Sequence, residues 1–151
     1  MAEIRYTIES EGRTKKNHQM IAGAGKRCPV CHKHEKQWIR QGAAHDNFAE
    51  LARWQLRPVP PKPIDCPVNV KCLFYMQTRR RVDKGNLEAA IHDLLVDCGI
   101  LADDNRDIIA TTDGSMVLYD KEHPRVEITI TKLKGYEQWS KKPDSRQETL
   151  F

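Results

Sequence analysis

The sequence predicts an α+β domain in which helices pack against a mixed β-sheet. Two patterns lead to this expectation. In several short segments apolar residues alternate with polar ones, which is typical of strands with one buried face. In two longer segments apolar residues recur every three or four positions, as on the buried side of a helix. The chain has 151 residues, which is enough for one domain with a modest core.

Five strands are expected, over residues 3–9, 68–76, 107–112, 115–119 and 125–131. The clearest is 68–76, where alternate residues from Val68 to Met76 are apolar and share one face. Asp113-Gly114 is a turn signal between the third and fourth of these strands.

Helices are expected over residues 45–56 and 83–97. In the second, Asp83 is a suitable N-cap and Gly99 fits the C-terminal cap. Five prolines between Arg57 and Pro67 indicate an extended connection between the first helix and the second strand. The expected order is therefore β-α-β-α-β-β-β.

The domain is expected to span residues 1–134. Residues 10–27 read as a polar loop, and a zinc-binding insertion is considered for residues 26–42. Residues 135–151 are mostly polar and are predicted to form a flexible C-terminal tail.

The composition is that of an ordinary soluble protein, with 39% hydrophobic and 30% charged residues. No apolar run is long enough to cross a bilayer, and the N-terminus lacks the apolar core of a signal peptide, so a cytoplasmic location is expected. Five cysteines without a secretory context favour reduced thiols or a metal site over disulfides. The net charge of +4 permits binding to nucleic acid without establishing it.

Acidic residues flank the second predicted helix. Asp83 follows the arginine run Arg79-Arg80-Arg81, and Asp103-Asp104-Asn105 follows the end of the helix. Carboxylates that gather in this way can hold Mg²⁺, which activates water and stabilises charge during phosphodiester cleavage. Arginines beside them would hold the DNA backbone. Alternatively, Asp83 is only a helix cap and the Asp-Asp-Asn segment only a solvated turn.

These landmarks together resemble the RusA family of Holliday-junction resolvases. The resemblance rests on the segment from Arg79 to Leu87, on Asp93 and Gly99, on Asp103 to Asn105, and on Pro124 to Ile128. It extends over residues 66–132 and includes the first strand loosely. It implies a homodimeric endodeoxyribonuclease, often encoded by phages, that resolves Holliday junctions or other branched DNA with Mg²⁺ or Mn²⁺. A two-fold enzyme suits a substrate that needs two symmetric incisions.

The resemblance also implies roles for individual residues. Asp83 and Asp104 match metal-binding, catalytic aspartates, with Asp103 beside the second, and Asn86 matches an asparagine of the motif. The DNA-binding residues expected are Asn86, Arg79, Arg80, Arg81, Lys15 and Lys16.

Two positions depart from the family pattern: Gly85 replaces an aspartate and Ala89 replaces a lysine. Lys84 is the candidate for the missing catalytic cation, and Asp93 or Asp113 for the missing metal ligand. The same departures support an alternative, a protein that binds junctions or other DNA without cleaving them.

Cys28-Pro29-Val30-Cys31 has the spacing of a zinc-binding turn. His34 and His45, or His18, are candidates to complete a tetrahedral site. Cys66 and Cys72 fit less well, because Cys72 lies on an apolar strand face. The alternative is a pair of free thiols in a polar loop.

The last five residues, Gln147-Glu148-Thr149-Leu150-Phe151, resemble the Q-x-x-L-F peptide that docks bacterial proteins on the DNA sliding clamp. Leu150 and Phe151 would fill an apolar pocket, and Gln147 would form a hydrogen bond at its rim. The alternative is a frayed tail. A third function is thus considered, that of a zinc-bearing adaptor tethered to the clamp.

Overall fold

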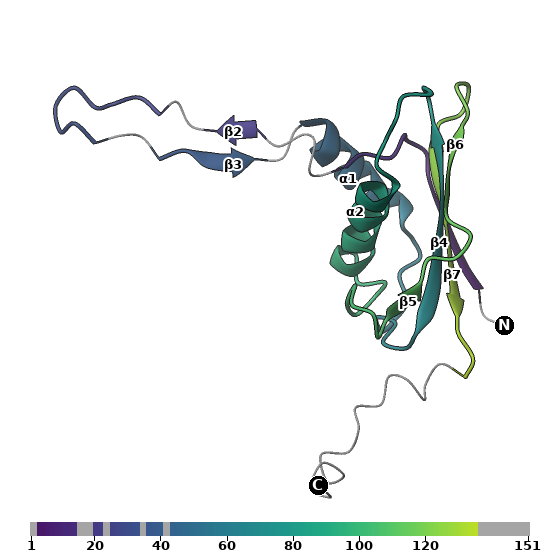
Figure 1. Cartoon of the computed structure of the whole chain (residues 1–151). Coiled ribbons are helices and arrows are strands. Elements are labelled where there is room, and N and C mark those ends of the chain that lie inside the picture. Colours follow the sequence, from purple (N-terminus) through teal and green to yellow (C-terminus); the bar gives the residue numbers. More distant parts are fainter. Residues whose placement is uncertain (1–2, 15–19, 23–24, 34–35, 41–42, 136–151) are drawn as a thin grey trace, which may run out of the picture.

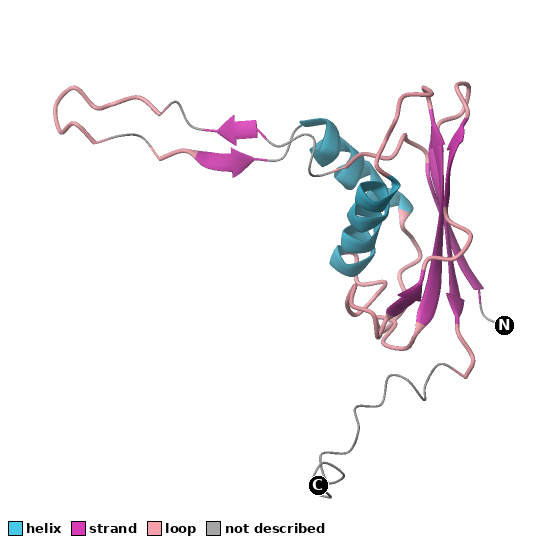
Figure 2. Ribbon diagram, in the orientation of Figure 1, coloured by secondary structure: helices cyan, strands magenta, loops and turns pink. Residues whose placement is uncertain are grey.

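A computed structural model describes residues 3–14, 20–22, 25–33, 36–40 and 43–135 of the chain. Over these residues a mixed five-stranded sheet carries two helices on one of its faces (Figure 1, Figure 2). The predicted α+β class is confirmed.

The elements lie in the order β1 (Glu3–Ile8), β2 (Met20–Ala22), β3 (Trp38–Arg40), α1 (Ala43–Gln55), β4 (Val68–Met76), α2 (Lys84–Asp97), β5 (Ile109–Thr111), β6 (Met116–Tyr119) and β7 (Arg125–Lys132). Both predicted helices and the strand over 68–76 are confirmed. The strand predicted over 107–112 is shorter, because Ile108 and Ile109 first close a turn by donating to the Asn105 carbonyl.

The main sheet has the strand order β1-β7-β4-β5, and β6 pairs with β4 as well. β7 lies between β1 and β4 and is antiparallel to both, whereas β5 and β6 run parallel to β4. This parallel pairing follows from α2, which carries the chain from the end of β4 back to the level of its start. The helix therefore has one end beside each end of β4.

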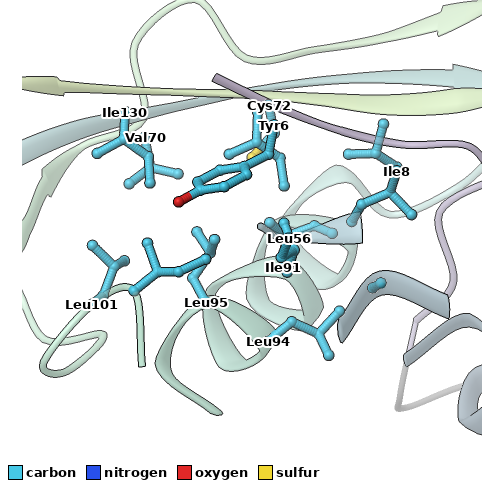
Figure 3. Packing of buried hydrophobic residues seen from close by; sticks show 14 of the residues in the cluster. Tyr6, Ile8, Leu56, Val70, Cys72, Ile91, Leu94, Leu95, Leu101 and Ile130 are labelled. Carbon is cyan, nitrogen blue, oxygen red and sulfur yellow. The ribbon is translucent and has the colours of Figure 1, made fainter. Parts of the chain in front are cut away.

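The core lies between the sheet and the helices (Figure 3). Alternate residues of β4 are buried from Val68 to Met76, as the sequence pattern predicts. Opposite them, α2 buries five residues, namely Leu87, Ala90, Ile91, Leu94 and Leu95. Each fully buried leucine or isoleucine contributes about 1.5–3 kcal/mol to stability. This packing holds both ends of α2 at fixed positions against the sheet.

The turn predicted at Asp113-Gly114 is confirmed, but the two strands that flank it do not pair with each other. β5 and β6 do not form a hairpin around Asp113-Gly114; both lie along the same edge of β4. Asn69 of β4 explains the difference, because its side chain accepts hydrogen bonds from Thr111 Oγ1 and the Asp113 N–H. Ser115 Oγ accepts from the Cys72 N–H at 3.0 Å. Two side chains thus replace ladder bonds where the edge strand bulges.

The predicted polar loop over residues 10–27 also needs correction, because β2 begins within it. β2 and β3 pair antiparallel as a short hairpin that projects from the body and carries residues 25–33 toward its tip (Figure 1). We call residues 20–40, as far as they are described, the arm. The sequence does not predict these two strands, because each has only three residues, too few for an alternating pattern to be recognised.

The remaining predictions on organisation are untested. The tail predicted over 135–151 lies outside the described residues except for Gly135. Among the described helices, none is both long enough and apolar enough to cross a membrane.

Candidate active site

Asp83 is fixed at the N-terminal end of α2. Its backbone is extended, with φ −82° and ψ 108°, and it caps the helix as the sequence predicts. Oδ1 accepts from the Asn86 N–H at 3.1 Å, and Oδ2 accepts from Asn86 Nδ2 at 3.0 Å. Because each carboxylate oxygen has a second lone pair, Asn86 orients the carboxylate and still leaves it able to bind a cation.

A pocket opens beside Asp83 between the start of α2, the end of β4 and the segment that follows β1. Its lining residues are Glu11, Gly12, Arg13, Thr14, Met76, Thr78, Arg80, Arg81, Val82, Asp83 and Leu87. The pocket thus combines two carboxylates with three arginines, and Leu87 anchors one wall in the core.

Glu11 is the residue of this pocket that the sequence analysis missed. Its side chain is only 16% exposed, and Oε2 lies 3.4 Å from Arg13 Nη2. Oε1 accepts from the Gln77 N–H at 3.1 Å, which ties Glu11 to the chain just beyond β4. The only signal in the sequence is an acidic residue shortly after the first strand. Its nearness to Asp83 depends on how that strand pairs.

Gly12 explains why Glu11 reaches the pocket. A Cβ at this position would lie 3.1 Å from Phe74 Cδ1 and 3.4 Å from Leu87 Cδ2. Such distances are tighter than ordinary van der Waals contact, so a side chain would push the segment away from the core. The absence of a Cβ lets residues 11–14 lie directly on the sheet and on α2.

The predicted basic residues differ in their surroundings. Arg80 and Arg81 line the pocket, whereas the Arg79 guanidinium stacks over the Tyr119 ring at 4.7 Å. Lys84 Nζ pairs with Glu88 Oε1 at 2.8 Å, one turn along α2. The ammonium group of Lys84 is therefore directed along the helix, and the cations that line the pocket are Arg13, Arg80 and Arg81.

Asp103 and Asp104 lie beyond the opposite end of α2. The 14 residues of the helix span about 20 Å, so it separates Asp83 from this pair within one chain. Asp103 Oδ1 accepts from the Asp104 N–H at 2.7 Å, and Oδ2 accepts from Asn105 Nδ2 at 2.9 Å. The three residues form a compact exposed turn.

His92 of α2 lies within electrostatic range of Asp104. Burial lowers the pKa of His92, and the carboxylates of Glu88, Asp104 and Asp93 oppose that effect. Asp104 is thus close enough to α2 to act on His92 electrostatically. Asp93, the other helical candidate, is half-buried on the same helix.

Asp113 lies beside the start of β4. Its backbone N–H donates to Asn69 Oδ1 at 2.7 Å. Asn69 is seven residues before Met76, which lines the pocket, and that is about 23 Å along a strand. Asp113 and the Asp103–Asp104 turn therefore lie toward the end of the sheet opposite to Asp83.

The donor set at the pocket fits Mg²⁺. Asp83 and Glu11 offer hard carboxylate oxygens, and Mg²⁺ is commonly held by one or two carboxylates together with water and substrate phosphate. Among the residues that the structure describes, no group of three or more His, Cys, Asp or Glu side chains could hold a metal. The pocket thus offers two carboxylates, and of the predicted metal ligands Asp83, Asp103, Asp104 and Asp113 it is Asp83 that lines it.

The predicted zinc ligands are not all brought together. Cys28 and Cys31 share a turn in the arm, where the Cys31 N–H donates to Cys28 Sγ at 3.5 Å. The N–H groups of Cys31 and Val30 lower the pKa of the Cys28 thiol below its usual range. His45 instead is buried in α1, where it lines a pocket with Leu94 and Asp97 of α2.

The other predicted site residues lie outside the described part of the chain. They are Lys15, Lys16, His18, His34, Gln147, Leu150 and Phe151.

A family model described as Endodeoxyribonuclease RusA matches residues 13–131 of the chain. The match includes Arg80, Arg81 and Asp83 at the pocket, the whole of α2 and the Asp103–Asp104 turn. Glu11 lies just before it. A search of curated proteins finds no match.

Proposed function

Because the chain belongs to the RusA family of endodeoxyribonucleases, we propose that it cleaves Holliday junctions or similar branched DNA with the help of Mg²⁺. One observation carries the proposal: the Asp83 carboxylate, oriented by Asn86, lies in a pocket together with Glu11, Arg80 and Arg81.

The two carboxylates are the proposed metal ligands. Bound between them, Mg²⁺ would polarise the scissile phosphate and lower the pKa of a water molecule. Asp83 is suited to this role because Asn86 holds both of its oxygens in one orientation. Glu11 is suited because its link to the Gln77 N–H fixes its position at the pocket.

Arg80 and Arg81 are the proposed contacts to the DNA backbone. Both are exposed and line the pocket, so their guanidinium groups can pair with phosphate oxygens next to the metal ligands. Arg13 pairs loosely with Glu11 and can turn toward a phosphate when DNA binds. These cations would draw the phosphodiester toward Asp83.

Glu11 is our proposal for the carboxylate missing at Gly85. Asp113, weighed as a substitute from the sequence, lies near the far end of β4, whereas Glu11 lines the pocket itself. Lys84 is proposed to stabilise α2 through its ion pair with Glu88. Arg80 and Arg81 are proposed to supply the positive charge that the family pattern places at Ala89.

Asp104 is proposed to act with Asp83 across two copies of the chain. Within one copy α2 separates the two residues, so a second copy packed with its α2 antiparallel would bring Asp104 next to Asp83. Such an arrangement is two-fold symmetric, as paired incision of a junction requires.

A cleavage assay tests the main proposal. A synthetic four-way junction and a linear duplex of the same sequence are incubated with the full chain, with MgCl₂, with MnCl₂ or with EDTA. We expect paired incisions in the junction only, and only with metal. Absence of product with both metals, or equal cutting of the duplex, contradicts the proposal.

Mixed dimers test the sharing of the site. Asp83→Asn and Asp104→Asn chains carrying different tags are co-expressed and the mixed dimer is isolated. If the site is shared, the mixed dimer has one intact site and nicks one strand. If each site lies in a single chain, the mixed dimer is as inactive as either variant alone.

A second candidate is a junction-binding protein without nuclease activity. Gly85 and Ala89 favour it, because each replaces a charged residue of the family pattern. It predicts tight, salt-sensitive binding of the junction and no product in the same assay.

Docking on the bacterial sliding clamp through Gln147, Leu150 and Phe151 is a separate proposal, supported only by the sequence of the last five residues. We expect a chain lacking residues 147–151 to lose binding to the clamp in a pull-down and to cleave junctions normally. Equal binding by the full and truncated chains would refute it.

A further inference from the structure

The tip of the arm has a defined backbone but no core of its own. Every described residue in 25–33 and 36–38 is exposed or half-buried, and Val30 is 86% exposed. Nevertheless the chain closes a turn here: the Cys28 N–H donates to the Lys33 carbonyl at 2.9 Å, and the His32 N–H to the Cys28 carbonyl at 3.0 Å. Because an isolated two-stranded hairpin is at best marginally stable in water, the tip needs another source of stability.

The two cysteines occupy the turn in a way that suits a shared ligand. The Cys31 N–H donates to Cys28 Sγ, so this sulfur lies against the backbone of the turn. His32 follows at φ +57°, a left-handed conformation that turns the chain directly after the second cysteine. Neither thiol is in a disulfide. An amide that donates to a sulfur stabilises a thiolate, and thiolates are the ligands zinc prefers.

We propose that Cys28 and Cys31 bind a zinc ion at the tip of the arm and that this ion takes the place of a core there. Zinc is the metal that fits best, because two soft sulfur ligands on a tight turn match one half of its tetrahedral set. Three basic residues flank the two cysteines in the sequence, Lys26, Arg27 and Lys33. Their positive charge favours the negatively charged thiolate form.

A redox role for the same pair fits less well. Reactive cysteine pairs of this spacing usually lie at the start of a helix, whose N-terminal charge stabilises the thiolate. Cys28 and Cys31 lie instead in a turn between two hairpin strands, and among the described residues the next helix begins at Ala43. The zinc site is independent of the proposed nuclease function, because the arm and the pocket of Asp83 share no lining residue.

Metal content tests the proposal directly. The full chain is purified after expression with added zinc, desalted, and its metal measured by mass spectrometry. The same is done for Cys28→Ser, Cys31→Ser and, as a control, Cys66→Ser, which removes a half-buried thiol of the body. We expect stoichiometric zinc in the parent and in Cys66→Ser, and none in the other two. Equal zinc in all four proteins, or none in the parent, would overturn the proposal.

Cobalt substitution identifies the ligands. Co²⁺ in the same site should give the intense visible bands of tetrahedral coordination and a thiolate charge-transfer band in the near ultraviolet. The intensity of that band distinguishes two thiolates from four. If the spectrum shows two thiolates and there is one metal ion per chain, a single chain completes the site. If it shows four thiolates and there is one metal ion per two chains, the tips of two chains share the ion. Both outcomes support the site, whereas a spectrum without thiolate bands contradicts it.

Limited proteolysis with trypsin provides a readout that does not depend on metal analysis. Arg27, Lys33 and Lys36 are exposed cleavage positions at the tip. We expect the tip to be cut much faster after zinc is removed with a chelator, while the body stays intact because its core does not include the arm. Cleavage at the same rate with and without chelator would contradict the proposal.

Discussion

At the N-terminal end of α2, Asp83 lines a pocket that includes Glu11 and three arginines, and Asn86 holds both oxygens of its carboxylate. At the other end, Asp103 accepts hydrogen bonds only from its neighbours Asp104 and Asn105, in an exposed turn. Both ends carry acidic residues that match the family pattern. A single chain thus places one of these carboxylates in a pocket and the other in an exposed turn.

The comparison predicts unequal effects of similar substitutions at the two ends. Asp83→Asn should lower junction cleavage about 1,000-fold, equivalent to about 4 kcal/mol of transition-state stabilisation, because it removes the charge of a proposed metal ligand. Asparagine caps a helix as well as aspartate does, so thermal unfolding should be unchanged. Asp97→Asn, an exposed change on the same helix, is the control. Asp83→Asn activity within tenfold of the parent contradicts the assignment.

Asp104→Asn should have the second largest effect. We expect cleavage to fall about 100-fold, with junction binding preserved, if Asp104 completes a metal site of a second copy. Asp107→Asn, an exposed acidic residue after the same turn, should change nothing. If Asp104 is only a turn residue, Asp104→Asn and Asp107→Asn will have the same single-turnover cleavage rate. Of the two ends of α2, the N-terminal end alone would then take part in cleavage.

Glu11→Gln should lower activity about tenfold and raise the Mg²⁺ concentration needed for half-maximal rate, because a neutral amide is a weaker ligand for Mg²⁺. The amide oxygen can still accept from the Gln77 N–H, so the segment should keep its position. Glu3→Gln, at the exposed start of β1, is the matched control. An unchanged Mg²⁺ titration for Glu11→Gln would remove Glu11 from the metal site.

Gly85→Asp should have the smallest effect and the opposite sign. A Cβ at this position would lie 3.3 Å from Asp83 Oδ1, so a new carboxylate would stand next to Asp83 after a slight adjustment. We expect cleavage at low Mg²⁺ to rise a few-fold. The helix should also gain about 0.3–1 kcal/mol, because an acidic residue in the first turn interacts favourably with the helix dipole.

Gly85→Asn separates these two contributions, because it adds a side chain of the same size without a charge. If both variants titrate alike with Mg²⁺, the new carboxylate does not reach the metal site. The pocket beside Asp83 then lies on the other side of the carboxylate, toward Glu11.

Much of the fold could be predicted because the signals are local. The alternation from Val68 to Met76 and the cap at Asp83 both depend on neighbours in the sequence, and both are confirmed. The pairing of β5 and β6 with β4 could not be predicted, because it depends on Asn69, which binds residues more than 40 positions later.

The residues of the candidate site could likewise be predicted only where the signal is local in the sequence. Asp83, Arg80 and Arg81 are adjacent in sequence to the start of α2, so a local motif finds them. Glu11 joins them only because β1 pairs with β7 and Gly12 allows a close approach to Phe74. The position of Asp104 relative to Asp83 depends on how Ile100 and Leu101 return the chain after α2, which a spacing pattern along the sequence does not reveal.

The broken edge of the sheet also limits how copies of the chain can associate. β5 and β6 cover the outer side of β4 in two short pieces, with a register shift in the β4–β5 pairing and the Asp113–Gly114 turn between the two strands. A bulged, interrupted strand is a poor template for another strand, so this side of the sheet resists chain-to-chain extension and aggregation. In the main sheet, the uninterrupted edge strand is β1, at the opposite side, and continuous pairing between copies is open there.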